Sequence, residues 1–229
     1  MTISFTNWWR AVLFALLPLT CISQENLTVY WQPQLAINYP VSKTYSHNFT
    51  VGHRAYLFDQ DDIQIRGRQI DFIHFSKLDL RDNQSIALGI QYRTRDLFGK
   101  QPNELRLTQQ YNTTKQPLVV RYGHRFRTEQ RFIEKLTIHR FRYRFAIDFP
   151  LKGEKLNLGE PFLVASLENL LSLGKGQNPQ YDNRLNGQVG WKFDKGFKIL
   201  FGIEYRLEDY TSQRPENVLF FLSTAQLGF

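Results

Sequence analysis

Hydrophobic and polar residues alternate one by one along much of this chain. In residues 197–207 every odd position is aromatic or aliphatic, and the charged residues stand at even positions. Residues 137–149 repeat the pattern, with Arg140, Arg142 and Arg144 separated by aromatic residues. Because successive side chains of a strand point to opposite faces, each segment predicts a β-strand with one charged and one apolar face.

Eleven segments follow this alternation, some of them more weakly, and clusters of Asp, Asn, Gly and Pro separate them as turns require. No segment repeats apolar residues with the period of a helix. Bacterial membrane barrels have an even number of strands, so one of the eleven segments is expected not to be a strand. The prediction is an all-β protein, a transmembrane antiparallel up-and-down β-barrel of about 10–12 strands, drawn from residues 27–39, 49–58, 63–77, 86–95, 105–111, 119–127, 137–149, 162–171, 185–193, 197–207 and 219–229. The alternation changes phase within residues 63–77.

Alternation alone does not decide which face lies outside. A water-soluble barrel packs its apolar face inward, whereas a membrane barrel turns that face toward lipid. The chain ends in Phe229, with Leu227 and Phe221 in phase behind it. Chains that end in this way are similar to outer-membrane barrels, whose insertion machinery recognises a terminal Phe on the lipid face. We therefore expect outer-membrane lipid and the barrel-insertion machinery as partners.

The N-terminus predicts export. Residues 1–23 contain one positive charge at Arg10, a short apolar run, and small residues at Cys21 and Ser23. This is the layout of a secretory signal peptide, and the apolar run is shorter than the ~20 residues that a spanning helix needs. Cleavage near Ser23 would leave residues 24–229 as one outer-membrane barrel domain without cysteine. The predicted location is the outer membrane of a Gram-negative bacterium.

The amino-acid composition agrees with β-strands, and the positive net charge raises the question of nucleic-acid binding. Aromatic residues make up 15% of the 229 residues, and the formal net charge is +8. Basic proteins often bind nucleic acid through clustered Lys and Arg. Here the arginines recur at every second strand position and do not form one basic surface, so nucleic acid is not an expected partner.

If the apolar face meets lipid, the alternating charges line the lumen. Charge on the lipid side would cost about 2–4 kcal/mol for each Arg near the midplane. The predicted lumen ladder has Glu104, Glu168 and Glu204 as its carboxylates and more arginines than these can neutralise: Arg106, Arg121, Arg125, Arg140, Arg142, Arg144, Arg184 and Arg206. Such a ladder is either a salt-bridge network that fills a narrow lumen or a conduit or pocket for a small anionic solute, with Arg140, Arg142 and Arg144 recognising it.

Several of these segments resemble a known family. They are residues 104–106 with Gln109 and Gln110, residues 121–129, residues 140–144, Glu168 with Asn169, and residues 181–185 leading to Gly187. In this order they are similar to the uncharacterised bacterial outer-membrane proteins grouped as domain of unknown function 2490. The resemblance covers most of the chain after residue 23 and implies a barrel and an export route, but no activity.

Two other functions stay open at this stage. One is a lipid- or peptide-modifying outer-membrane enzyme. His53, His124 and His139 fall on the aromatic face by parity, where a catalytic base would need a nucleophile beside it, and Ser46 and Ser76 lie close in sequence to His47 and His74. The other is a soluble periplasmic β-barrel that binds an acidic ligand. The sequence has no phosphate-binding glycine loop, no metal-spaced His or Cys cluster and no Gly-x-Ser-x-Gly, so no catalytic residue, cofactor or metal is predicted.

Overall fold

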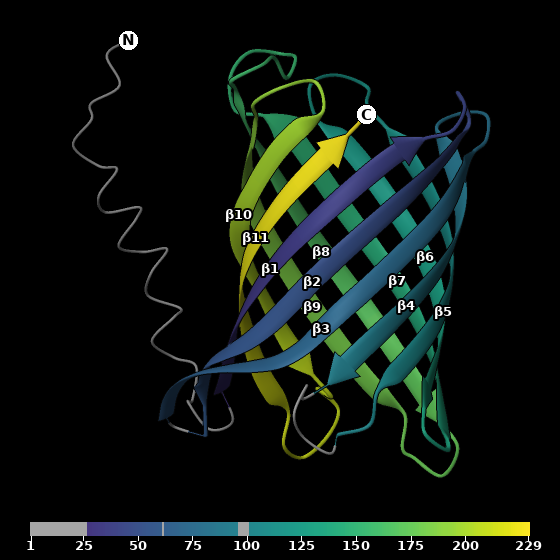
Figure 1. The fold of residues 1–229 in the computed structure, drawn as a ribbon, viewed down its shortest axis with the longest axis vertical. Coiled ribbons are helices and arrows are strands. Elements are labelled where there is room, and N and C mark those ends of the chain that lie inside the picture. The colour runs from purple at the N-terminus through teal and green to yellow at the C-terminus, as the bar shows by residue number, and fades with distance from the viewer. Residues whose placement is uncertain (1–26, 61, 96–100) are drawn as a thin grey trace.

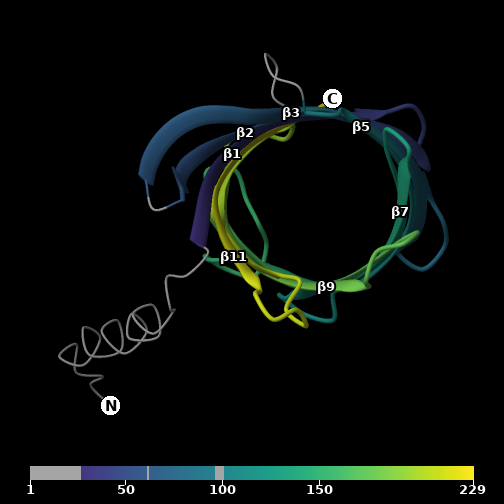
Figure 2. The same ribbon diagram turned by 90° about the horizontal axis from the view of Figure 1, so that it is seen from below.

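The computed structural model describes residues 27–60, 62–95 and 101–229, and the predicted signal peptide lies outside them. All eleven predicted segments are strands, and together they close into one barrel (Figures 1 and 2). The strands are β1 Leu27–Pro40, β2 Tyr45–Asp59, β3 Asp62–Asp79, β4 Gln84–Arg95, β5 Glu104–Lys115, β6 Arg121–Ile133, β7 Leu136–Pro150, β8 Pro161–Gly174, β9 Gln180–Lys192, β10 Phe197–Glu208 and β11 Glu216–Gly228. The prediction of an all-β barrel within the range of ten to twelve strands is confirmed.

The expectation of an even strand number and of antiparallel pairing throughout is wrong. Neighbouring strands alternate in direction around the barrel, so with eleven strands the first and the last run the same way. β1 and β11 therefore pair in parallel, from Leu27 opposite Asn217 to Asn38 opposite Gly228. All other neighbours are antiparallel, and membrane barrels with an odd number of strands exist.

The parallel seam between β1 and β11 is held by aromatic side chains that point into the lumen. Tyr30 and Phe220 are 4% and 1% exposed, and their rings stack with centroids 5.1 Å apart. The guanidinium groups of Arg54 and Arg206 lie 4.7 and 3.9 Å from the centroid of the Phe220 ring. Val218 completes this small buried cluster. The inner side of the seam is therefore apolar and is covered by two guanidinium groups. The alternation in the sequence did not distinguish this strand pair from the others.

The pairing of β2 with β3 explains the phase change predicted within residues 63–77. Arg54 lies opposite Gln69 and Ala55 lies opposite Gly67, so Arg68 is an extra residue on β3. A β-bulge of this kind shifts the alternation by one residue. Beyond the bulge, Ile63 and Ile65 are more than 80% exposed, on the part of the hairpin that extends past the ring in Figure 2.

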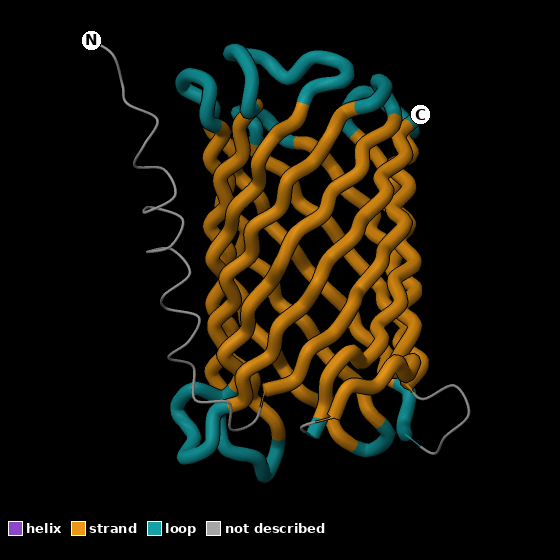
Figure 3. Tube along the Cα trace, turned by 90° about the vertical axis from the view of Figure 1, so that its left-hand side faces the viewer, coloured by secondary structure: helices purple, strands orange, loops and turns teal. Residues whose placement is uncertain are grey.

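Two ends of the barrel can be distinguished (Figures 1 and 3). The end where β1 begins, drawn at the bottom, holds the turn after β2 and the loop of residues 209–215. The other end holds the loop of residues 151–160 and the C-terminal Phe229. Within the described residues, no helix is long and apolar enough to cross a membrane.

We expect the seam cluster to contribute strongly to stability. Phe220→Ala should lower the free energy of unfolding by about 3–5 kcal/mol, because a fully buried ring leaves a cavity. Phe201→Ala on the neighbouring β10 removes an outward ring that is 54% exposed and should cost clearly less. Urea unfolding of both variants in detergent micelles checks this, and equal losses would contradict a special role for the seam.

Candidate functional site

The inner face of the barrel is charged and the outer face is not. The charged side chains that are at most 9% exposed are Arg54, Asp71, Arg93, Glu104, Arg106, Glu129, Arg131, Glu168, Asp182, Arg184 and Arg206. On the outer face, Leu88, Leu185, Phe201 and Ile203 are each more than half exposed. The apolar face therefore lies outside, and the charges are enclosed in the lumen.

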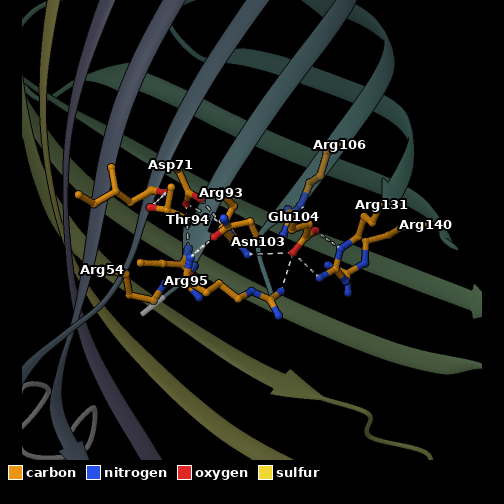
Figure 4. A network of polar contacts seen from close by, with 12 residues as sticks. Arg54, Asp71, Arg93, Thr94, Arg95, Asn103, Glu104, Arg106, Arg131 and Arg140 are labelled. Carbon is orange, nitrogen blue, oxygen red and sulfur yellow. Dashed lines mark hydrogen bonds and ion pairs between the residues drawn. The ribbon is translucent and has the colours of Figure 1, made fainter. Parts of the chain in front are cut away.

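Glu104 on β5 is the centre of one charge network (Figure 4). Its side chain is fully buried and lies 2.5 Å from Arg95 and 2.5 Å from Arg131, and Arg106 binds it through Nε. Arg93 is 3.9 Å from Glu104 and forms a two-pronged ion pair with Asp71, at 2.6 and 3.0 Å. One carboxylate thus contacts arginines from β4, β5 and β6 and ties these strands together from inside.

Glu168 on β8 is the centre of a second network. Arg125 donates to it at 2.7 Å, Arg142 binds it through Nη2, and Arg184 lies 3.9 Å away. Arg142 also donates to Glu129 at 2.6 Å, so its guanidinium bridges two carboxylates. The middle of the lumen is therefore filled with paired charges.

The predicted ladder residues differ in their burial and in their ion-pair partners. Glu104, Arg106, Arg125, Arg142, Glu168, Arg184, Glu204 and Arg206 point inward and have ion-pair partners. Arg140 also points inward, and its Nε donates to Ser172 at 2.8 Å, with Asp182 no closer than 4.0 Å. Arg144 keeps a buried Nε without a partner. Arg121 lies at the rim, 55% exposed, in an ion pair with Asp148 at 2.8 Å. Phe221 and Phe229 are exposed on the outer wall, and Leu227 shares their face.

Sequence reasoning did not single out several lumen residues. They are Arg54, Arg68, Asp71, Glu129, Arg131, Asp182 and Glu208. Glu129 and Arg131 lie on β6 beyond the predicted end at residue 127, and Asp182 lies before residue 185, where the predicted strand begins. Extending the alternation of residues 121–127 by four residues would have found Glu129 and Arg131.

A cavity of about 360 Å³ lies in the lumen beside these networks, and we call it the arginine chamber. Its carboxylates are Asp71 and Glu208, against ten arginines: Arg54, Arg68, Arg93, Arg95, Arg106, Arg131, Arg140, Arg142, Arg184 and Arg206. Five of its other lining residues are glutamines. The chamber therefore has a large excess of positive side chains and many neutral amides.

A second cavity, of about 590 Å³, leads from the chamber to the lower end of the barrel, and we call it the vestibule. It shares Arg54, Arg68 and Glu208 with the chamber. Gln60 in the turn after β2 and Arg214 in the loop of residues 209–215 also line it. The chamber thus has a neighbouring space at this end through which a solute can approach.

The arginines are neutralised unevenly. Among the described residues, no carboxylate oxygen lies within 4.0 Å of Arg54, Arg68 or Arg144. Arg54 instead donates to the amide oxygen of Gln32, at 3.0 and 2.8 Å. Buried guanidinium Nε atoms without a partner also occur in Arg125, Arg142 and Arg184. A buried cation without a counter-charge is costly, so Arg54, Arg68 and Arg144 are the arginines that would gain most from an added negative charge.

The histidines lie on the outer face. His47 and His74 are 3.0 Å apart through Nδ1 and Nε2, and His124 is 2.9 Å from the Tyr143 hydroxyl. Ser76 hydrogen-bonds the hydroxyl of Tyr45 at 2.6 Å. Among the described residues, no serine hydroxyl is hydrogen-bonded to a histidine, and no three His, Cys, Asp or Glu side chains are grouped to hold a metal ion.

Comparisons with known proteins return a family and no individual relative. No curated protein and no solved structure matches the chain. The model of a family described as protein of unknown function (DUF2490) matches residues 29–217, which span ten strands and the start of the eleventh. The chain therefore belongs to the DUF2490 family.

Proposed function

We propose that this protein is exported, spans the outer membrane of a Gram-negative bacterium, and binds a small anion in its lumen without catalysing a reaction. The outer wall supports the membrane location. Its strand positions carry large apolar side chains such as Trp31, Leu88 and Phe201, all more than 40% exposed. A water-soluble barrel would leave this surface in water, far beyond the few hundred Å² of apolar patch usual for monomers.

The closed sheet supports the same location. Every strand pairs with two neighbours, so the barrel has no free edge whose backbone groups would be left unpaired in lipid. The predicted signal peptide of residues 1–23 and the terminal Phe229 supply the export route and the contact for the insertion machinery. Nucleic acid is not a proposed partner, because the buried arginines line the lumen and do not form a basic outer surface.

The arginine chamber is the single observation that carries anion binding. Among the residues that the structure describes, ten arginines and two carboxylates line it. Such a site attracts oxyanions, because planar guanidinium groups donate two parallel hydrogen bonds to carboxylate or phosphate. A cavity of about 360 Å³ is within the size range of small-molecule sites.

The side chains in the middle of the lumen are buried, which favours binding of a solute over its free passage. Glu104, Glu129 and Glu168 are at most 5% exposed. Lumen side chains of a wide water-filled channel stay in contact with water, as in porins. The protein therefore resembles a receptor or a narrow conduit more closely than an open pore.

Membrane sidedness can be measured by cysteine labelling in lipid vesicles. Phe201→Cys should react poorly with a charged maleimide, because its side chain faces lipid. Leu118→Cys, in a loop and 85% exposed, should react fully in the same vesicles opened by freezing and thawing. Equal reactivity of the two cysteines would mean that the apolar wall faces water.

The insertion signal can be tested in cells. Deleting Phe229 should lower the amount of folded barrel in the outer membrane, because the insertion machinery would lose its terminal aromatic contact. Heat-modifiable mobility on gels measures the folded fraction, and deletion of the loop residue Leu118 is a control for general damage. A normal folded fraction without Phe229 would remove this part of the proposal.

Anion binding can be tested with one conservative substitution. Gln32→Glu places a carboxylate where Arg54 now donates to an amide. It should raise the stability of the free protein by about 1 kcal/mol through a charged hydrogen bond. It should also weaken binding of inorganic phosphate about tenfold or more, since an added negative charge opposes the ligand.

Isothermal titration in phosphate-free buffer measures the phosphate affinity of the detergent-solubilised native protein and of Gln32→Glu. Gln226→Glu is the matched control, because Gln226 lies on β11 outside the chamber lining. It should leave phosphate affinity unchanged. Failure of the native protein to bind phosphate, sulfate or citrate would refute the anion-binding proposal.

A further inference from the structure

Arg68 occupies an unusual position in the wall of the arginine chamber. As the extra residue of the bulge on β3, it sits between Gly67 and Gln69 without a directly paired partner on β2. Arg68 and Gln69 are consecutive, yet both line the chamber. Regular strands send consecutive side chains to opposite faces, so the bulge is what turns Arg68 inward.

Two neighbouring tyrosine rings lie against the Arg68 guanidinium. It lies 4.9 Å from the centroid of Tyr30 and 5.5 Å from that of Tyr56. Among the described residues it makes no side-chain hydrogen bond and no ion pair. Cation–π contacts use the face of a guanidinium, so its in-plane N–H donors stay available to a ligand. Arg68 also lines the vestibule and therefore stands where the two cavities meet.

Arg184 stands on the opposite wall. β3 and β9 are five strands apart in one direction around the ring and six in the other. Arg184 is 8% exposed and has a buried Nε without a partner, and its carboxylate neighbours lie at 3.8 and 3.9 Å. Its neighbour in the chamber, Arg140, is held by the Ser172 hydroxyl and has Asp182 only at 4.0 Å.

Incompletely neutralised arginines thus face the chamber from two opposite walls, Arg54 and Arg68 on one and Arg140 and Arg184 on the other. A ligand with two linked oxyanion groups can place one group against each wall. We propose that the ligand is a small polyanion with at least two linked oxyanion groups, which bridges the two walls and is bound by Arg68 where the vestibule meets the chamber. This inference rests on the proposed anion-binding function and specifies the class of its ligand.

The experiment compares inorganic phosphate with tripolyphosphate by isothermal titration of the folded protein in detergent. Tripolyphosphate should bind at least about tenfold more tightly, because it gains charged hydrogen bonds on the second wall. Arg68→Gln should reduce this preference to about threefold or less, with little effect on phosphate held by the opposite wall. Arg184→Gln should also reduce the preference.

Arg121→Gln is the matched control, since Arg121 is a rim arginine outside both cavities. It should keep the full preference for tripolyphosphate. Arg68→Gln orphans no carboxylate among the described residues, and its gel mobility before and after heating reports that it is folded. Arg68→Lys retains the charge but has no in-plane fork, and it should recover only part of the preference.

The outcomes separate the two proposals. Equal affinity for phosphate and tripolyphosphate, or an unchanged preference in folded Arg68→Gln, would overturn the bridging inference and leave simple anion binding in place. Absence of binding for both anions would overturn both. Equal weakening of phosphate and tripolyphosphate in Arg121→Gln would point to a general charge effect and would also overturn the assignment to Arg68.

Discussion

The strict alternation of side chains in a closed sheet is the constraint on which this molecule depends. A barrel strand has only two faces, so residues that cannot lie outside must lie inside. The outer face here takes the aromatic and aliphatic residues, and the arginines at the intervening positions of β5, β6 and β7 are therefore enclosed. Enclosed charges need partners from neighbouring strands, and the two carboxylate centres at Glu104 and Glu168 meet that need.

These centres also link neighbouring strands in a barrel whose buried apolar cluster is small. Glu104 contacts arginines from three strands, and Arg142 joins Glu129 on β6 to Glu168 on β8. Breaking a buried pair typically costs about 3–5 kcal/mol, so each bridge couples the strands on either side of it. The aromatic cluster at Tyr30 and Phe220 performs the same task at the parallel seam, where the lumen is locally apolar.

Much of this architecture could be predicted from the sequence. Period-two alternation located all eleven strands, and parity placed Arg142 and Glu168 on the same face. A rule about even strand numbers led to a wrong expectation, because nothing in a single sequence tells whether the closing pair is parallel. The individual partners were also out of reach. The contact between Arg125 and Glu168 skips the whole of β7, so pairing of adjacent strands does not predict it.

The bulge shows a second limit of the pattern. A phase change within residues 63–77 was visible, but its consequence depends on which residue is extra, and only the register with β2 identifies Arg68. Asp71 lies three residues after Arg68. A strand pattern whose phase changes at the bulge therefore does not show that Asp71 faces the lumen. Guanidinium groups also stack on Tyr30 and Phe220, and both rings line the vestibule, so the bulge and the parallel seam lie at that cavity.

The glutamines of the chamber bear on why its charge excess persists. Gln32, Gln34, Gln69, Gln91 and Gln180 all line it. A glutamate at position 32 would have nearly the same shape as Gln32 and would give Arg54 a counter-charge. A barrel that used its arginines for stability alone would gain from this carboxylate, since among the described residues the Arg54 side chain donates hydrogen bonds only to the amide oxygen of Gln32. Neutral amides beside unneutralised guanidinium groups instead keep the cavity positive and leave its remaining counter-charge to come from a ligand.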